Sequence, residues 1–180
     1  MMQGLFASLY ELIKQPPPSG QGVKTDSSIL LIYPPDKELD FKEYLVDTFV
    51  PHLRANAVPF THLDVTGFLF QCLAESDIES LHEAEFDNYR WMQQGLSQRV
   101  EAALQRRLTD ITLEKPGAPV LVSSTVALHP LVRYGEILRG LRDLDGRVVL
   151  AFPGEERGGR LHFMNEHDGG NYLAVKLFWQ

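Results

Sequence analysis

The chain has 180 residues, of which 44% are hydrophobic and 23% are charged, and this composition predicts one globular domain with a sizeable core. Its formal charge of -7 opposes nonspecific binding to nucleic acid, because such binding depends on Lys and Arg neutralising phosphates. The lone Cys72 excludes an internal disulfide and a cysteine metal cluster. No segment approaches the roughly 20 apolar residues that span a bilayer, and the start lacks the features of a signal peptide, so we expect a cytoplasmic protein that does not enter a membrane.

Apolar side chains recur at helical spacing at the start of the chain, which predicts an amphipathic helix. The following "QPPPSGQG" has the composition of a linker. The sequence therefore predicts a helix at 1–14, a linker at 15–27 and a single α/β domain at 28–180. The helix either packs on its own domain or docks on a partner, to which it would offer Leu5, Leu9 and Tyr10.

Four apolar runs bounded by turn-forming residues predict strands. The first, "SILLIY" at 28–33, is continuously apolar, as expected for a central parallel strand that is buried on both faces. The others are "PFTHLDV" at 59–65, "VLVSS" at 120–124 and "RVVLAFPG" at 147–154. The tail alternates between polar and apolar residues around a turn, which predicts a β-hairpin from 161 to 178.

Helical patterns separate these strands. The helix after the first strand contains Pro51, which lacks a backbone donor, so we expect a kink or a break there. Residues 76–110 predict one long helix or two, and 125–146 predict a loop and a helix. We therefore expect an α/β fold with a mostly parallel central sheet, helices on both faces and a final antiparallel hairpin. Acidic residues at 75–87 form a solvated face or a surface for a basic partner: Glu75, Asp77, Glu79, Glu83, Glu85 and Asp87.

Ligands in such sheets bind beyond the carboxyl ends of the strands. A phosphate-binding loop after the first strand would need glycines and a Lys–Ser/Thr pair, because backbone N–H groups must approach the phosphates. The loop here is "PPDK" at 34–37, which has two prolines and no glycine. The nearest alternative, "GQGVKT" at 20–25, has the wrong spacing and precedes the strand. The sheet thus resembles a P-loop-type sheet without its Walker motif.

The polar residues at the strand ends could support other chemistry. Ser123 or Ser124 could form a triad with His129 and Asp64, although the G-x-S-x-G elbow is absent. Their hydroxyls could equally satisfy backbone groups at the strand end. The alternative site at this rim comprises Asp36, Asp64, Ser123, Ser124 and Glu155, with His129 and Arg133 in reach. His162, Glu166, His167 and Asp168 match no ligand spacing, so we expect no metal and no cofactor.

Arg133 begins the helix after the third strand. It could form an i,i+3 surface ion pair with Glu136, worth ~0.3 kcal/mol. It could instead contact an anion or a partner, since Arg is enriched at interface hot spots.

A more specific signal lies in "LHPLVRYGEILRGL" followed by "VVLAFPGEERGGRLHFMNEHDGGNYLAVKL". This part resembles the C-terminal half of the BrxB family, a small component of BREX bacteriophage-exclusion systems, and the N-terminal half agrees more loosely. The family pattern has a Pro-x-x-Arg helix start, a strand ending in aromatic-Pro-Gly, a Gly-x-Leu-x-Phe strand and a final Asn-Tyr strand. The matching residues are Pro130, Arg133, Phe152, Pro153, Gly154, Gly159, Leu161, Phe163, Asn171 and Tyr172; the chain departs from the pattern at His129 and Leu173.

The resemblance implies a non-enzymatic adaptor in a phage-defence complex. It implies a PglZ-type alkaline-phosphatase-like protein as partner, with a large ATPase and a DNA methyltransferase of the same system as further candidates. We expect the contacts at Arg133, His129 and Glu136, and on the N-terminal helix. The alternative is a hydrolase or nucleotide-binding enzyme with its site at the strand ends.

Overall fold

The computed structural model describes residues 1–15, 28–73, 79, 89–141, 146–167 and 174–179, with only the main chain at 89–93. Some predictions fall outside these residues. They are the linker at 16–27, the acidic residues other than Glu79, the turn at 168–170, and the family positions Asn171, Tyr172 and Leu173.

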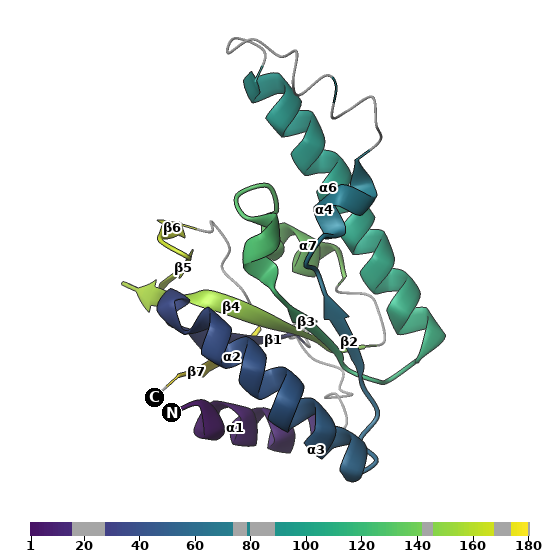
Figure 1. Cartoon of the computed structure of the whole chain (residues 1–180), viewed down its shortest axis with the longest axis vertical. Coiled ribbons are helices and arrows are strands. Elements are labelled where there is room, and N and C mark those ends of the chain that lie inside the picture. Colours follow the sequence, from purple (N-terminus) through teal and green to yellow (C-terminus); the bar gives the residue numbers. More distant parts are fainter. Residues whose placement is uncertain (16–27, 74–78, 80–88, 142–145, 168–173, 180) are drawn as a thin grey trace, which may run out of the picture.

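The centre of the fold is a mostly parallel sheet of seven strands, as predicted (Figure 1). Five strands follow one another in the order β2-β3-β4-β1-β7, and every pairing along this path is parallel. Two short strands, β5 and β6, continue antiparallel from the far half of β4. The strand bounds are β1 Ile29–Tyr33, β2 Thr61–Asp64, β3 Val120–Ser123, β4 Val148–Arg157, β5 Arg160–Phe163, β6 Glu166–His167 and β7 Val175–Phe178.

Strand β1 explains why helices must cover both faces of the sheet. All five of its residues are buried. Leu30 and Ile32 belong to one hydrophobic core, whereas Ile29, Leu31 and Tyr33 belong to the other. Because successive side chains point to opposite faces, this unbroken apolar run can be buried only between two helical layers.

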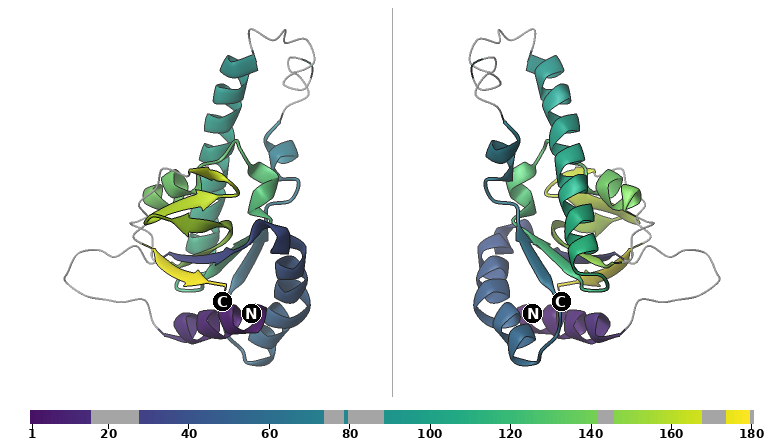
Figure 2. Two further views of the ribbon diagram at one scale, coloured as in Figure 1. Left: turned by 90° about the vertical axis from the view of Figure 1, so that its left-hand side faces the viewer. Right: turned by 90° about the vertical axis from the view of Figure 1, so that its right-hand side faces the viewer.

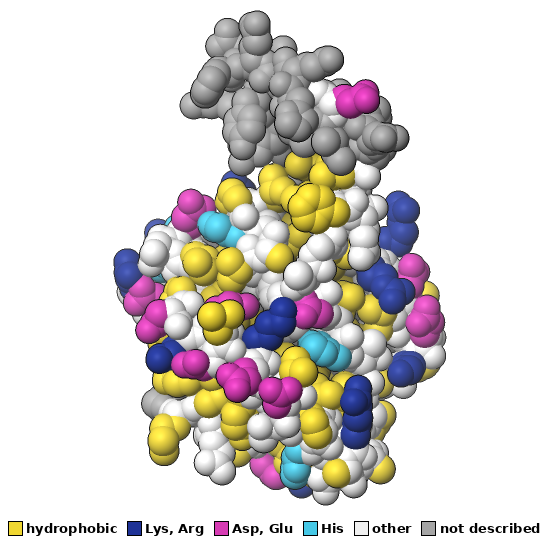
Figure 3. Space-filling view, viewed as in Figure 1, with side chains coloured by type: hydrophobic (Ala, Val, Ile, Leu, Met, Phe, Trp, Pro, Cys, Tyr) yellow, Lys and Arg dark blue, Asp and Glu magenta, His cyan; other side chains and the backbone are white. Residues whose placement is uncertain are grey.

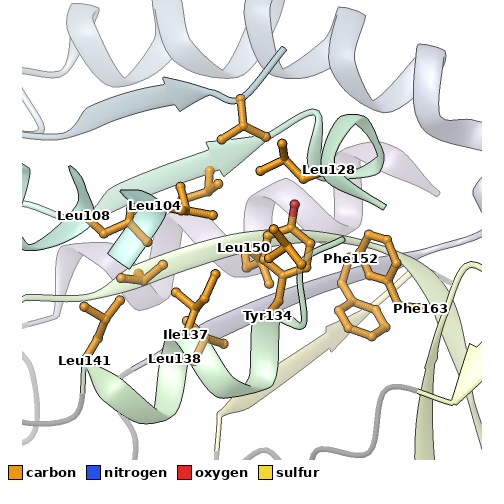
Figure 4. Close-up of a cluster of buried hydrophobic side chains, with 14 of the residues drawn as sticks. Leu104, Leu108, Leu128, Tyr134, Ile137, Leu138, Leu141, Leu150, Phe152 and Phe163 are labelled. Carbon is orange, nitrogen blue, oxygen red and sulfur yellow. The ribbon is translucent and has the colours of Figure 1, made fainter. Parts of the chain in front are cut away.

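One layer consists of α4 (Phe68–Cys72), α6 (Tyr89–Glu114) and α7 (Tyr134–Gly140). The sequence places Met92, Leu96, Val100, Ala103, Leu104 and Leu108 on one apolar stripe of this helix. Four of them, Leu96, Val100, Leu104 and Leu108, are buried and Ala103 is partly buried, while the side chain of Met92 lies outside the described part. Figure 4 shows Leu104 and Leu108 facing side chains of α7 and β4. Residues 89–114 thus form one helix; the part of the predicted 76–110 segment before residue 89 lies outside the described residues, apart from Glu79.

The other layer consists of α1 (Met2–Lys14), α2 (Glu38–Tyr44), η2 (Leu45–Phe49) and α3 (Val50–Ala55) (Figure 2). Phe6 of α1 has ring contacts with Phe41, Tyr44 and Phe49 at centroid distances of 5.1, 5.0 and 4.8 Å. The guanidinium of Arg147 also donates a hydrogen bond to a carbonyl of α1. The N-terminal helix therefore packs on the body of its own chain.

Pro51 does not break its helix. The chain stays helical from 38 to 55 and widens into a π turn over 45–49, just before the proline. The N–H of Val50 donates to the carbonyl of Leu45, five residues back, as in a π turn. The helix therefore accommodates Pro51 without a break, and both Phe49 and Leu53 stay buried.

The final hairpin is present but shorter than the predicted 161–178. It pairs β5 with β6, and β5 also pairs with the far half of β4. The last strand, β7, lies parallel beside β1 instead, in the register Ile29↔Val175 to Ile32↔Phe178. A period of two predicts a strand but does not select its neighbour.

Gly154 marks the point where β4 passes from the parallel sheet into the hairpin. It lies within a strand that continues to Arg157, and not at the strand end that the sequence suggested. A Cβ atom at this residue would lie 2.0 Å from the carbonyl oxygen of His162. Glycine is therefore required by the close approach of β5, while Gly158 and Gly159, at φ 57° and 75°, form the turn.

We expect Gly154→Ala to lower the free energy of unfolding by about 3 kcal/mol, because the strands must separate to admit the methyl group. Gly95→Ala is the matched control. A Cβ atom on this α6 residue meets nothing within 4 Å, so the change should raise stability by about 0.5–1 kcal/mol through helix propensity. Urea denaturation of both variants tests this prediction, and equal stability of Gly154→Ala and the parent would contradict it.

Candidate functional site

The loop after β1 is a tight turn, and the side chain of Tyr33 packs beside it. Its residues 35–37 form the 3-10 turn η1 (Pro35–Lys37), in which the N–H of Lys37 donates to the carbonyl of Pro34 at 2.9 Å. Beneath the turn, the ring of Tyr33 stacks on Phe41 at 4.0 Å, and its hydroxyl donates to the carboxylate of Glu38. Burial, followed by the charge of Glu38, raises the pKa of Tyr33 far above its ordinary value. Asp36 stands exposed on this turn.

At the end of β2, Asp64 is the centre of a small polar network. The ammonium of Lys42, on α2, lies 3.2 Å from one carboxylate oxygen, and the N–H of Thr66 donates to the other at 2.8 Å. The same ammonium donates to the hydroxyl of Thr66 at 3.3 Å. In Figure 3, basic, acidic and histidine side chains adjoin where α2 meets β2. This network ties α2 to the sheet.

The hydrogen bonds around Asp64 favour its ionised form. Partial burial by itself raises the pKa of this carboxyl group, but hydrogen bonds from Thr66 and Lys42 outweigh burial and lower the pKa to about 2. A carboxylate with so low a pKa is a poor proton acceptor at neutral pH. Asp64 is thus better suited to holding Lys42 and Thr66 than to general-base chemistry.

Ser123 has a histidine partner, but not the one that the sequence suggested. Nε2 of His62, on β2, lies 2.8 Å from Oγ of Ser123, on β3. Burial, with help from the charges of Lys42 and Arg54, lowers the pKa of His62 against the opposing effect of Asp64. Ser123 is only 1% exposed, so this hydrogen bond satisfies its buried hydroxyl with a half-buried imidazole and presents no accessible nucleophile.

The sequence did not identify His62 as the partner of Ser123, because the residues around it match no motif. Its signal lay in the strand register: Asp64 pairs with Ser123 across β2 and β3, and His62 is on the same face two residues earlier. Only a known pairing between the two strands would have revealed it.

His129 lies apart from Ser123 and Asp64. It follows the 3-10 turn η3 (Thr125–Leu128), and its ring lies 5.6 Å from that of Phe163 on β5. The peptide bond that joins it to Pro130 is cis. Pro130 does not open the next helix, because α7 begins at Tyr134 with Arg133 as its N-cap.

Arg133 and Glu136 line a groove of about 500 Å³ between α6 and the start of α7. The main-chain N–H of Arg133 donates to the carboxylate of Glu101 at 2.8 Å, which ties this turn to α6. Glu136 forms its ion pair with Arg139 at 3.2 Å, and not with Arg133 as predicted. The side chain of Arg133 is exposed. The remaining lining residues are Gln94, Ser97, Gln98, Glu101, Pro130 and Leu131.

Glu155 stands beyond the sheet rim. It lies on the antiparallel half of β4, opposite His162, and forms an ion pair with Arg157. Nearby, the ring of His162 lies edge-on to that of His167 at 5.6 Å. Within the part of the chain that the structure describes, no three His, Cys, Asp or Glu side chains are placed to hold a metal ion.

The predicted residues therefore do not form one site. Asp64, Ser123 and Ser124 gather at the ends of β2 and β3; the others stand apart from them. Asp36 lies on η1, His129 against β5, Glu155 on the hairpin, and Arg133 with Glu136 in the α6–α7 groove. On α1, Leu5 and Leu9 are 2% and 0% exposed, so a partner could reach them only if the helix left its core. Tyr10 is half-buried, and its ring is tilted against that of His52 at a centroid distance of 4.8 Å.

Comparisons of the chain with protein-family models, with curated proteins and with solved structures give no match. Among the described helices, none combines the length and the apolar character needed to cross a membrane.

The Asp64 network predicts a dependence of stability on pH. In the folded protein the pKa of Asp64 is about 2, below its ordinary value of 3.8. The stabilising contribution of Asp64 is therefore complete above pH 3.8 and is lost as the pH falls toward 2. The expected loss is about 1 kcal/mol, after solvent screening of a side chain that is 34% exposed. Asp64→Asn should remove this part of the acid dependence, measured by urea denaturation between pH 6 and 2.

Asp40→Asn is the matched control. Asp40 forms an exposed pair with Lys37 at 3.3 Å, and such surface pairs contribute little to stability. Its acid profile should follow that of the parent protein. If Asp64→Asn also followed the parent, the network would not stabilise the fold.

Proposed function

We propose that the protein is a non-enzymatic adaptor of a BREX-type anti-phage complex and that it binds a PglZ-type alkaline-phosphatase-like protein through the α6–α7 groove. One observation carries the proposal: Arg133 and Glu136, both predicted from the sequence as partner contacts, line the same groove. The resemblance to the BrxB family supplies the identity of the partner. A large ATPase and a DNA methyltransferase of the same system are further candidate partners.

The groove has the features of a protein contact surface. One wall is α6, and the other is the turn at 130–133 with the start of α7. The Glu101 hydrogen bond ties the two walls together, so the shape of the groove exists before a partner arrives. The groove is largely lined by amides, hydroxyls and charged groups, with Pro130 and Leu131 as its apolar part. An exposed Arg on a rigid support is a typical anchor for a carboxylate or a carbonyl of a partner.

The strand ends, by contrast, give little support to an enzyme. Ser123 is buried against His62, and Asp64 is occupied by Lys42 and Thr66. The turn after β1 carries two prolines where phosphate binding needs exposed N–H groups. The alternative, a hydrolase or nucleotide-binding enzyme, would have to use a different arrangement of these residues.

We expect Arg133→Glu to weaken binding of the co-expressed PglZ-type protein about tenfold or more, measured by titration of the purified proteins. The main-chain hydrogen bond to Glu101 survives this change, so the melting temperature should stay the same. Arg107→Glu is the control, because Arg107 is an exposed residue of α6 that does not line the groove. Equal binding by both variants would exclude the groove, and absence of binding by the parent protein would exclude this partner.

A second measurement separates the adaptor from the enzyme. ATP and GTP with Mg²⁺ should leave the melting temperature unchanged, because a ligand that binds the native state must raise it. A nucleotide whose phosphates rest against residues 34–37 in a crystal would overturn the adaptor proposal.

A further inference from the structure

The outer edge of β7 is the starting point for an inference that is independent of the proposed partner. β7 ends the strand order, so no described strand pairs with its outer side. The N–H groups of Val175 and Trp179 donate to the carbonyls of Ser28, just before β1, and of Ile32, within it, at 2.9 and 2.8 Å. By the alternation of a parallel ladder, the N–H and C=O groups of Lys176 and Phe178 point away from β1. Unpaired groups of this kind are a template for another strand.

A groove runs along this edge. It has a volume of about 920 Å³ and lies between β7 and the first turns of α1, which run side by side in Figures 1 and 2. On the helix side it is lined largely by small or apolar residues: Met1, Gly4, Leu5, Ala7 and Ser8, with Gln3. Its helical wall therefore leaves room for main chain beside β7.

Apolar side chains are concentrated at the same place. Among the described residues, seven large hydrophobic side chains are exposed, and three of them flank this edge: Met1 at 80%, Val175 at 45% and Phe178 at 42%. Val175 and Phe178 point to opposite faces of the sheet. An exposed edge with apolar side chains on both faces is what a sheet presents where it continues into another chain.

We propose that a second copy of this chain covers the edge, with the two β7 strands antiparallel about a two-fold axis at Leu177. In this register Lys176 of each copy opposes Phe178 of the other, and both are hydrogen-bonded pairs. All four outward groups of each copy are then satisfied at once. The same arrangement brings the small-residue sides of the two α1 helices toward each other on one face of the joined sheet. One self-complementary surface thus serves both copies.

The charges favour a copy at this position. The protein carries a net charge of -7, so two copies repel over most of their surface. The groove lining contains no carboxylate, and its one charged side chain, Lys176, is already paired with Glu156 at 3.3 Å. An approach along β7 therefore brings together surfaces that do not repel.

The test measures mass in solution by sedimentation equilibrium across a wide range of concentrations. We expect a dimer, with twice the 20.4 kDa of one chain. Lys176→Pro removes an outward N–H while the β1 pairing stays, so it should weaken the dimer about tenfold or more. Lys176→Ala loses the same ion pair but keeps the N–H, and should remain a dimer.

Gly4→Glu keeps the proposal falsifiable if the proline variant does not fold. A Cβ atom at Gly4 meets nothing within 4 Å, and an acidic residue in the first turn of α1 favours the helix. This variant should therefore melt at a higher temperature and yet be a monomer, because it places two carboxylates across the interface. Gly4→Ala should melt higher and remain a dimer.

A parent protein that is monomeric at every concentration would overturn the proposal, as would a dimer that persists in both Gly4→Glu and a folded Lys176→Pro. If Lys176→Ala and Lys176→Pro weakened the dimer to the same extent, the side chain would matter and the strand pairing would not. That result would also overturn the proposal.

Discussion

The rest of the structure depends on β1. Its five residues are buried on both faces, and both of its edges are paired, to β4 on one side and to β7 on the other. An apolar strand of this kind, with both faces buried, is stable only between two helical layers. This constraint explains why α1 is needed. Phe6 and Leu9 of α1, which are only 1% and 0% exposed, cover part of one face of the sheet. Most of the remaining packing follows from that requirement.

Much of the architecture could be predicted from the sequence because the strongest signals are local. The unbroken "SILLIY" predicted a central strand, and the stripe from Leu96 to Leu108 predicted a buried helix face. The pairing of β7 could not be predicted, because a short alternating segment fits either edge of a sheet or a hairpin. The π turn before Pro51 was also missed, since a missing donor can be accommodated by a break, a kink or a wider turn.

The candidate site was predictable only in part, because sites depend on distances between segments far apart in the chain. That Asp64, Ser123 and Ser124 would meet follows from two parallel strands ending at one rim. That His62 and not His129 would reach Ser123 depends on which face each side chain takes. The groove at Arg133 has α6 as its second wall, so the sequence at the start of α7 could not by itself predict a groove there. Residue types at strand ends therefore identify candidate site residues. Burial and hydrogen bonding decide which of these residues remain accessible to a ligand.

The π turn over 45–49 has a consequence for how this helix can vary in length. A π turn accommodates one residue more than the α turn it replaces. Phe41 before it, Leu45 at its first position and Leu53 after it all face the same core. Deletion of a single exposed residue, such as Asp47, would let the segment wind as regular α-helix while the buried side chains on either side keep their orientation. The segment therefore contains a built-in position where the chain can shorten without changing the core.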